Sequence, residues 1–422
     1  MKKVSIALIG AGQRGGIYAS YALSHPEELR VAAVAEPDKD KREAFGRLYG
    51  IPENMCYSTW EELLSAPKTA DAVLVCTQDN MHTGPAIKAL EAGYHVLLEK
   101  PMSNNIEDCL SIDEHSQKYG RMVSVCHVLR FTPFFSTIKK IVDGGQIGRL
   151  ISIQHNENVG YWHQAHSYVR GNWRNSKESS PMILAKSCHD LDILLWLADS
   201  ECRSVASFGE LTHFKKENAP SGAPDRCLDG CPHREECPFY APRIYINGNT
   251  GFPASVISSD TGAKALTAAL REGPYGRCVY RCDNDAVDHQ IVAMEFKNSV
   301  TASFTMCAFT NEVSRTIKLM GTEGEIRGAM EKDEIEILRF AGGTKTKICL
   351  NPGTSGHGGG DEGIMRNFVK LLQTDTEDRL ASSGVSIRSH LLAFAAEKSR
   401  LEKRVIDIDQ YTRELRKGGS HG

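Results

Sequence analysis

The chain contains 422 residues, of which 50 are basic and 53 acidic, and its formal net charge is −3. A chain of this length is expected to form about two or three domains, and its balanced charge excludes a strong field that would recruit nucleic acid or an anionic membrane. No apolar run approaches the roughly 20 residues of a membrane span, and the 13 dispersed cysteines are typical of reduced thiols in a cytoplasmic protein.

The first predicted element is a buried strand at residues 4–9 that leads directly into the glycine-rich turn GAGQRG at residues 10–15. Only three residues precede this strand, so we expect no signal peptide. A strand followed by G-x-G-x-x-G is the phosphate-binding turn of a dinucleotide fold: the glycines allow a tight turn, approach of the pyrophosphate and close helix packing. Cofactor contacts are therefore expected from Gly10, Gly12, Gln13, Arg14 and Gly15.

A second buried strand is predicted at residues 31–35, and it ends in Glu36. An acidic residue at this point can accept hydrogen bonds from both ribose hydroxyls and repels a 2′-phosphate, which favours NAD over NADP. The alternative is that Glu36 is a solvated loop carboxylate.

Strand and helix patterns then alternate as far as residue 127, which is typical of a parallel sheet covered by helices. We therefore predict an α/β fold that begins with a Rossmann dinucleotide-binding domain at residues 1–127. The remaining strands are expected at 72–76, 95–98 and 122–126, and helices at 17–24, 40–49, 60–65, 81–92 and 106–119.

Beyond a helix at 133–142 the pattern changes to longer strands separated by hairpin turns. This favours a C-terminal α+β domain at 128–412 with a large open, mostly antiparallel sheet, used for substrate binding and homo-oligomerisation into a dimer or tetramer. A cysteine-rich insertion occupies about 215–285. Strands are expected at 150–154, 289–296, 300–307, 315–320 and 334–340, and returning helices at 364–372 and 385–402.

Four motifs make the chain resemble the Gfo/Idh/MocA oxidoreductases over nearly its whole length: the glycine turn, Cys76-Thr77 with His82, the run GYHVLLEKP at 93–101, and HDLD at 189–192. The resemblance implies an NAD-binding enzyme. It also implies that the lysine of Glu99-Lys100-Pro101 lies beside the nicotinamide and the substrate, with a proline bond that is often cis. Further cofactor contacts are implied for Thr77, His82, Glu99 and Lys100.

Oxidation of an alcohol requires a base for the hydroxyl proton, and a pKa near the operating pH suits that task. Histidine qualifies without perturbation, and burial with nearby positive charge can lower the pKa of lysine. Lys100 and His189 are the first candidates, and Asp192, one helical turn on, is expected to orient His189. The alternatives are a surface lysine and a histidine that caps a helix structurally.

The sequence departs from the family pattern four residues before His189. Related dehydrogenases often carry aspartate at that position, where this chain has Ala185 followed by Lys186. We predict that Lys186 replaces the missing group, either as a hydrogen-bond donor to substrate or by lowering the pKa of Lys100.

A polar and aromatic stretch precedes this helix. Rings suit the C–H face of a sugar while polar groups bind its hydroxyls, although the same rings could simply cover the sheet. The substrate candidates here are Tyr161, His163, His166, Arg170, Trp173 and Arg174. The resemblance further implies that the glycine-rich stretch at 356–361 closes over the sugar, which adds His357 and Asp361.

Five cysteines lie in two short clusters. Thiolates at such spacings can hold structural zinc or, as the less favoured option, an iron–sulfur cluster; free thiols and a disulfide are the alternatives. The residues are Cys227, Cys231, Cys237, Cys278 and Cys282.

The leading hypothesis is an NAD-dependent oxidoreductase acting on a ring hydroxyl of a sugar, sugar derivative or cyclitol. Its first alternative is a glycoside-cleaving enzyme in which tightly bound NAD oxidises the sugar transiently and permits elimination. Its second alternative is a non-catalytic, regulatory NAD(H)-binding protein.

Overall fold

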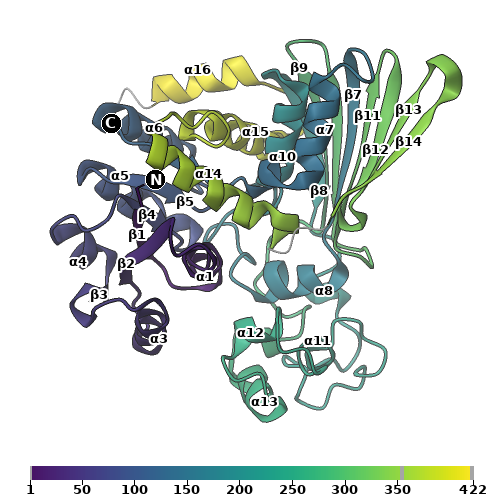
Figure 1. Cartoon of the computed structure of the whole chain (residues 1–422). Helices are drawn as coiled ribbons and strands as arrows, with labels where there is room; N and C mark the ends of the chain where they lie inside the picture. The colour runs from purple at the N-terminus through teal and green to yellow at the C-terminus, as the bar shows by residue number, and fades with distance from the viewer. Residues whose placement is uncertain (1, 352–355, 419–422) are drawn as a thin grey trace.

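A computed structural model describes residues 2–351 and 356–418 of the chain. Two sheets dominate it and stand side by side in Figure 1. The first is parallel, with six strands in the order β3-β2-β1-β4-β5-β6. These strands are β1 (Val4–Ile9), β2 (Leu29–Ala35), β3 (Cys56–Tyr57), β4 (Ala72–Val75), β5 (His95–Leu98) and β6 (Val123–Val125).

The parallel sheet confirms the predicted Rossmann architecture. All six residues of β1 are buried, as a central strand covered on both faces requires. Of the six strands of this parallel sheet, β3 alone was not predicted, because its two half-buried residues leave no apolar run to recognise. The crossover helices are α1 (Gln13–Ala19), α2 (Tyr21–Ser24), α3 (Lys39–Tyr49), α4 (Trp60–Ser65), α5 (Thr83–Glu91) and α6 (Ile106–Tyr119).

The second sheet has nine strands in the order β14-β13-β12-β11-β7-β10-β9-β8-β15. Only β7 and β10 pair in parallel, so the sheet is mostly antiparallel, as predicted. Its strands are β7 (Leu150–Asn158), β8 (Cys202–Glu210), β9 (His289–Phe296), β10 (Thr301–Cys307), β11 (Ser314–Gly321), β12 (Gly324–Ala329), β13 (Glu334–Arg339), β14 (Lys345–Cys349) and β15 (Ile406–Asp407).

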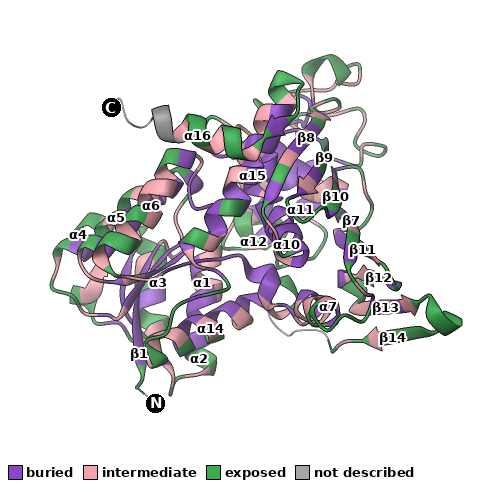
Figure 2. Cartoon of the chain, turned by 90° about the horizontal axis from the view of Figure 1, so that it is seen from above, coloured by how far each residue is buried: buried purple, intermediate pink, exposed green. Residues whose placement is uncertain are grey.

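Helices cover one face of this sheet and leave the other face open (Figures 1 and 2). Burial alternates along β9 and β10, as expected for strands with one covered face. Helix α15 contacts both α6 and β8, so it joins the two sheets. The helices of this region are α7 (Pro133–Asp143), α9 (Met182–Ala185), α10 (Cys188–Ala198), α14 (Gly360–Thr374), α15 (Ser383–Glu402) and α16 (Ile408–Gly418).

The cysteine-rich insertion forms a separate small core at the lower end of the view in Figure 1. It contains the short helices α11 (Ala241–Tyr245), α12 (Ala254–Ile257) and α13 (Ala263–Glu272). It packs against α8 (Tyr161–Gln164) and the π-helical segment Ala165–Arg170 that follows. Within the described ranges, no helix is both long and apolar enough to cross a membrane.

Candidate active site

The glycine turn has the geometry that its sequence requires. Gly10 adopts a φ of +91°, and a Cβ there would lie 2.6 Å from the carbonyl oxygen of Cys76. A Cβ on Gly15 would lie 2.2 Å from the carbonyl oxygen of Gly10. A Cβ on Gly12 would meet nothing within 4 Å, so this glycine faces open space. The first and third glycines are thus needed by the fold itself, and the second leaves room for a pyrophosphate.

Glu36 lies at the tip of β2, beside the glycine turn. Its Oε2 accepts a hydrogen bond from the Ala11 N–H at 2.8 Å, and its Oε1 accepts one from the Asp38 N–H at 3.1 Å. Two backbone amides therefore hold the carboxylate beside the glycine turn.

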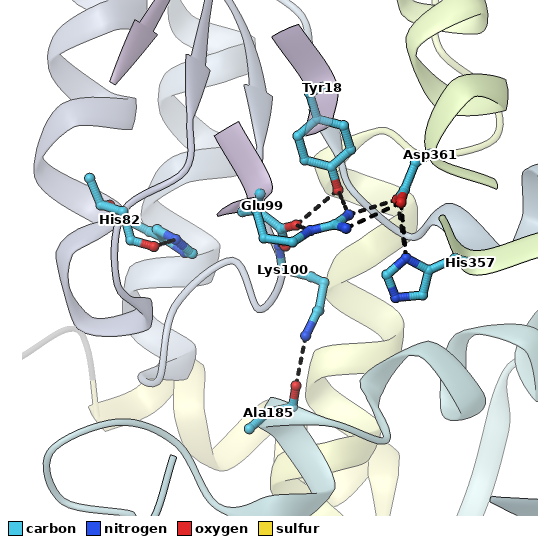
Figure 3. Close-up of polar contacts among 9 residues, drawn as sticks. Tyr18, His82, Glu99, Lys100, Ala185, His357 and Asp361 are labelled. Atoms are coloured by element: carbon cyan, nitrogen blue, oxygen red, sulfur yellow. Dashed lines mark hydrogen bonds and ion pairs between the residues drawn. The ribbon is translucent and has the colours of Figure 1, made fainter. Parts of the chain in front are cut away.

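The Arg14 side chain, predicted to contact the cofactor, is held by carboxylates of the protein itself. Its guanidinium donates to Glu99 Oε1 at 2.6 Å and to Asp361 Oδ1 at 2.7 Å, and Tyr18 also donates to Glu99 at 2.8 Å (Figure 3). Glu99 Oε2 accepts from the Lys100 N–H at 2.6 Å, so this predicted cofactor contact is likewise occupied within the protein. Both residues instead connect the glycine turn, the lysine segment and the start of α14.

The Lys100–Pro101 bond is cis. His82 Nδ1 lies 2.7 Å from the Pro101 carbonyl oxygen and its Nε2 lies 3.2 Å from that of Thr77, so this histidine supports the turn. Lys100 Nζ donates to the Ala185 carbonyl oxygen at 2.8 Å across the gap between the two domains (Figure 3). The structure therefore brings Lys100 to the segment just before His189.

His189 lies at the start of α10 and is buried. Burial holds its pKa well below the usual value, and the nearby positive charge of Lys100 lowers that pKa further. Its Nδ1 is buried without a hydrogen-bond partner. The rings of His127 and His357 lie 5.8 and 5.9 Å away, measured between centroids. The residue is thus a neutral imidazole close to Lys100.

The predicted orientation of His189 by Asp192 is wrong. Both carboxylate oxygens of Asp192 accept from Arg130, at 2.6 Å each, in a buried bidentate ion pair. Asp192 lies one helical turn after His189, but its carboxylate attaches α10 to the segment Val128–Phe131 before α7 and not to His189.

Lys186 follows Ala185, the position at which related dehydrogenases often carry aspartate. Its side chain belongs to a buried cluster of charged groups. Its Nζ lies 3.3 Å from Glu157 Oε1, and Glu157 Oε2 accepts from Arg315 at 2.7 Å. Arg315 also donates to Asp190 at 2.8 Å. Burial lowers the pKa of Lys186 and raises that of Glu157 to about 8.

His357 and Asp361 come together at the start of α14. His357 Nδ1 lies 3.2 Å from both carboxylate oxygens of Asp361 (Figure 3). Burial opposes ionisation of Asp361, but hydrogen bonds from His357 and Arg14 hold its pKa below the usual range. Burial lowers the pKa of His357.

The stretch at 161–174 divides into two parts. His163 is half-buried, and burial followed by the charge of Lys186 holds its pKa well below the usual value. Tyr161 packs edge-on against Phe239, with centroids 6.1 Å apart. Two predictions are wrong: His166 stacks on Tyr275 inside the insertion, and Arg170 is fully buried there.

Arg174 lines a cleft of about 390 Å³ between the two domains, and Trp173 contacts one of its lining residues. Trp173 Nε1 donates to Asp79 Oδ1 at 3.2 Å, and Ser180 donates to the other oxygen of Asp79 at 2.8 Å. Arg174 lines the cleft and pairs with Glu178 and Asp283. The cleft residues are Gln78, Asp79, Asn80, Asn172, Arg174, Glu178 and Ser179.

The residues that the sequence did not reveal are mainly the partners of the charged groups. Glu157 and Arg315 are register partners on β7 and β11, and Asp79 follows β4. Glu157 and Arg315 gave only a weak signal, because each is a charged residue at a buried position of a strand in which burial varies from residue to residue. Their pairing depends on strand order, which one sequence does not specify.

The zinc prediction is not confirmed. Within residues 2–351 and 356–418, no three or more His, Cys, Asp or Glu side chains are gathered as ligands of one metal ion. All 13 cysteines are free thiols.

Comparison with family models identifies both halves of the chain. Residues 4–127 match the oxidoreductase family, NAD-binding Rossmann fold, and residues 139–346 match the oxidoreductase family, C-terminal alpha/beta domain. The chain belongs to the Gfo/Idh/MocA family. Membership of the Gfo/Idh/MocA family agrees with the resemblance seen in the sequence, and the NAD-binding fold agrees with the open space at Gly12.

Relatives within the family include the scyllo-inositol 2-dehydrogenase (NAD(+)) of Bacillus subtilis strain 168, which is 26% identical over 286 residues, covering 65% of this chain and 69% of that enzyme. The 2,7-anhydro-N-acetylneuraminate hydratase of Mediterraneibacter gnavus is 27% identical over 209 residues, which span 50% of this chain but only 53% of the hydratase.

Among solved structures, the WlbA dehydrogenase of Bordetella pertussis in complex with NADH and UDP-GlcNAcA matches with a TM-score of 0.67. The match has 16% sequence identity and covers 96% of this chain and 99% of that structure. Similarity at this level establishes the shared fold.

Proposed function

We propose that this chain is an NAD-dependent oxidoreductase that interconverts a ring hydroxyl and a ketone on a sugar, sugar derivative or cyclitol. The observation that carries the proposal is the hydrogen bond from Lys100 Nζ to the Ala185 carbonyl oxygen, which brings this lysine of the dinucleotide-binding domain to the segment just before the buried His189. The name of the inositol-oxidising relative supports the substrate class.

Oxidation of an alcohol to a ketone removes a hydride from the carbon and a proton from the hydroxyl group. Bound NAD supplies the hydride acceptor. Lys100 Nζ is a donor that can release Ala185 and bind the reacting oxygen. His189 accepts the hydroxyl proton, and its lowered pKa keeps it in the neutral form that a base requires. Lys186 and His357 bind the neighbouring hydroxyls.

We propose Glu36 as the residue that selects NAD over NADP. Its carboxylate is fixed by the Ala11 and Asp38 amides, and a 2′-phosphate placed there would meet a like charge. Measured Michaelis constants should favour NAD in the wild type, and Glu36→Ser should narrow that preference. An unchanged ratio would overturn this assignment.

The test of the reaction is a panel of cyclitols, hexoses, uronates and their glycosides, each incubated with NAD. We expect NADH absorbance to rise in step with ketone formed from one class of compound. Glycoside cleavage without net NADH would instead support the redox-assisted elimination mechanism. NAD binding without turnover of any compound would support a regulatory protein.

We also propose that the protein is a homo-oligomer, a dimer or tetramer, in the cytoplasm. The open face of the nine-stranded sheet exposes Phe208 and its register partner Ile291, by 55% and 50%. Large apolar side chains paired on an exposed surface favour association. Free thiols throughout suit a reducing compartment. Sedimentation should show an oligomer for the wild type and a folded, smaller species for Phe208→Glu; a monomeric wild type would contradict the proposal.

A further inference from the structure

Four of the five clustered cysteines line a single cavity in the insertion. They are Cys227, Cys231, Cys237 and Cys278, and the remaining lining includes Arg170, Phe239 and Tyr280. The fifth, Cys282, lies outside this lining and its thiol donates to the Cys278 carbonyl oxygen at 3.4 Å. Two sequence segments about 40 residues apart thus deliver four thiols to one place.

Backbone pairing brings the two segments together. The Cys227 N–H donates to the Gly276 carbonyl oxygen at 2.9 Å, and the Cys278 N–H donates to that of Asp225 at 2.8 Å. This short bridge sets Cys227 and Cys278 side by side. A Cβ on Gly276 would lie only 1.7 Å from the Leu270 carbonyl oxygen, so the close contact between this turn and the end of α13 requires glycine.

Arg170 places a positive charge against this cavity. Its side chain is fully buried, and its Nη2 donates to the Phe239 carbonyl oxygen at 2.8 Å and lies 3.7 Å from Cys227 Sγ. Its Nη1 is buried without a hydrogen-bond partner. A buried cation of this kind needs a nearby anion.

The arrangement does not suit one metal ion. Zinc holds its thiolates at about 2.3 Å, which gathers four sulfurs closely around a point. No three of these cysteines are gathered in that way, although four surround the same cavity. Four cysteines around one cavity are the ligand set that iron–sulfur clusters use.

We propose that Cys227, Cys231, Cys237 and Cys278 bind an iron–sulfur cluster of the four-cysteine class. Each thiol loses its proton as its sulfur bonds to iron, and iron and inorganic sulfide enter as a preformed cluster, so the chain undergoes no redox change. The resulting anionic cluster neutralises Arg170, and the Ala241 N–H, 3.5 Å from Cys227 Sγ, donates to a ligand sulfur.

The cluster has a structural role in this account. Arg170 ends the π-helical segment that continues from Tyr161 and His163, and it donates to backbone carbonyl oxygens of the insertion. Anchoring Arg170 through the cluster therefore fixes the insertion to this segment.

The test is elemental analysis of the full chain purified without oxygen, or reconstituted with ferric iron, sulfide and an excess of a thiol reductant, which reduces the part of the iron that the cluster holds as ferrous. We expect iron and acid-labile sulfide in equal amounts, about two to four of each per chain, with the visible absorption of an iron–sulfur chromophore. Cys231→Ser and Cys237→Ser should lose most of the iron, whereas the matched control Cys282→Ser should retain it.

NAD binding serves as the folding control, because it depends on the other domain and not on the cluster. One zinc per chain without iron, or wild-type protein that retains neither metal after reconstitution, would overturn the proposal. Iron lost equally from Cys282→Ser would do the same. These readouts measure iron, so they stand or fall separately from the proposed oxidoreductase activity.

Discussion

At the scale of single residues, the site is a set of groups whose charges are fixed by burial. Lys100 was identified from its tripeptide motif, and His189 from its place before an apolar helix. Their partners were not predictable in the same way. Asp192 has the correct helical spacing to orient His189, yet Arg130, 62 residues earlier, takes its carboxylate instead. Local spacing indicates which side chains are neighbours on one helix, but tertiary packing decides which of them pair.

Replacing Lys100 with alanine should abolish most turnover and leave NAD binding intact. Loss of the donor at the reacting oxygen is expected to reduce kcat by about 10²–10⁴-fold. The measurements are steady-state kinetics and NAD titration. Lys88→Ala provides a control, since Lys88 is exposed on α5 and pairs with Glu91 on the same helix. Unchanged turnover in Lys100→Ala would contradict its assignment.

The pH dependence of kcat/KM should reflect the buried state of His189. A base acts in its neutral form, and burial with the charge of Lys100 lowers the pKa of His189 below 6.5. The neutral form therefore persists as the pH falls through 6.5, and activity should decline only at more acidic pH. A pH–rate profile checks this. An acidic limb centred above 6.5 would show that His189 is not the buried neutral base.

At the scale of elements, sequence patterns predicted most of what builds the site. The strand at 4–9 and the helices at 60–65 and 106–119 match the structure residue for residue. The strands β8, β12, β14 and β15 were not predicted, because their burial patterns are short or broken. The order of the strands in the sheet was also not predictable from the sequence. The pairing of Glu157 with Arg315 is therefore seen only in the sheet register.

Substitutions in the glycine turn can distinguish a glycine that the fold requires from one that cofactor binding requires. Gly10→Ala should destabilise the protein by about 1–3 kcal/mol or more, because φ is +91° and the Cβ meets the Cys76 carbonyl. Gly12 has a φ of −75° and open space, so Gly12→Ala should fold normally. Its affinity for NAD should fall by about tenfold or more, since the methyl group occupies the pyrophosphate space.

Chemical denaturation of the two variants measures the free energy of unfolding, and NAD titration measures their affinity for the cofactor. Equal NAD affinity for Gly12→Ala and wild type would contradict the placement of the pyrophosphate.

At the scale of the whole molecule, buried ion pairs and α15 hold the two sheets in one arrangement. Asp192→Asn should destabilise folding by about 3–5 kcal/mol, because it leaves the Arg130 guanidinium buried without its counter-charge. Asp409→Asn, in an exposed pair with Lys297, should cost only about 0–1 kcal/mol. Urea unfolding curves for both variants provide the comparison, and equal losses would refute the structural role of Asp192.

The overall architecture was predictable because each sheet type leaves its own period in the sequence. The separate core of the insertion was less predictable. Its cysteines form two clusters in the sequence, and Cys282 was grouped with the other four because it lies close to Cys278 in the sequence. The structure shows that Cys282 does not line the cavity that the other four share.

The most direct test of the central claim is to follow the carbon-bound hydrogen of a turned-over cyclitol or sugar. The substrate would carry deuterium on the reacting carbon, and the NADH formed would be examined by mass spectrometry. The account predicts that the deuterium appears in NADH, in proportion to ketone product, for the wild type and is absent with Lys100→Ala. Substrate consumed with no deuterium in NADH would contradict it.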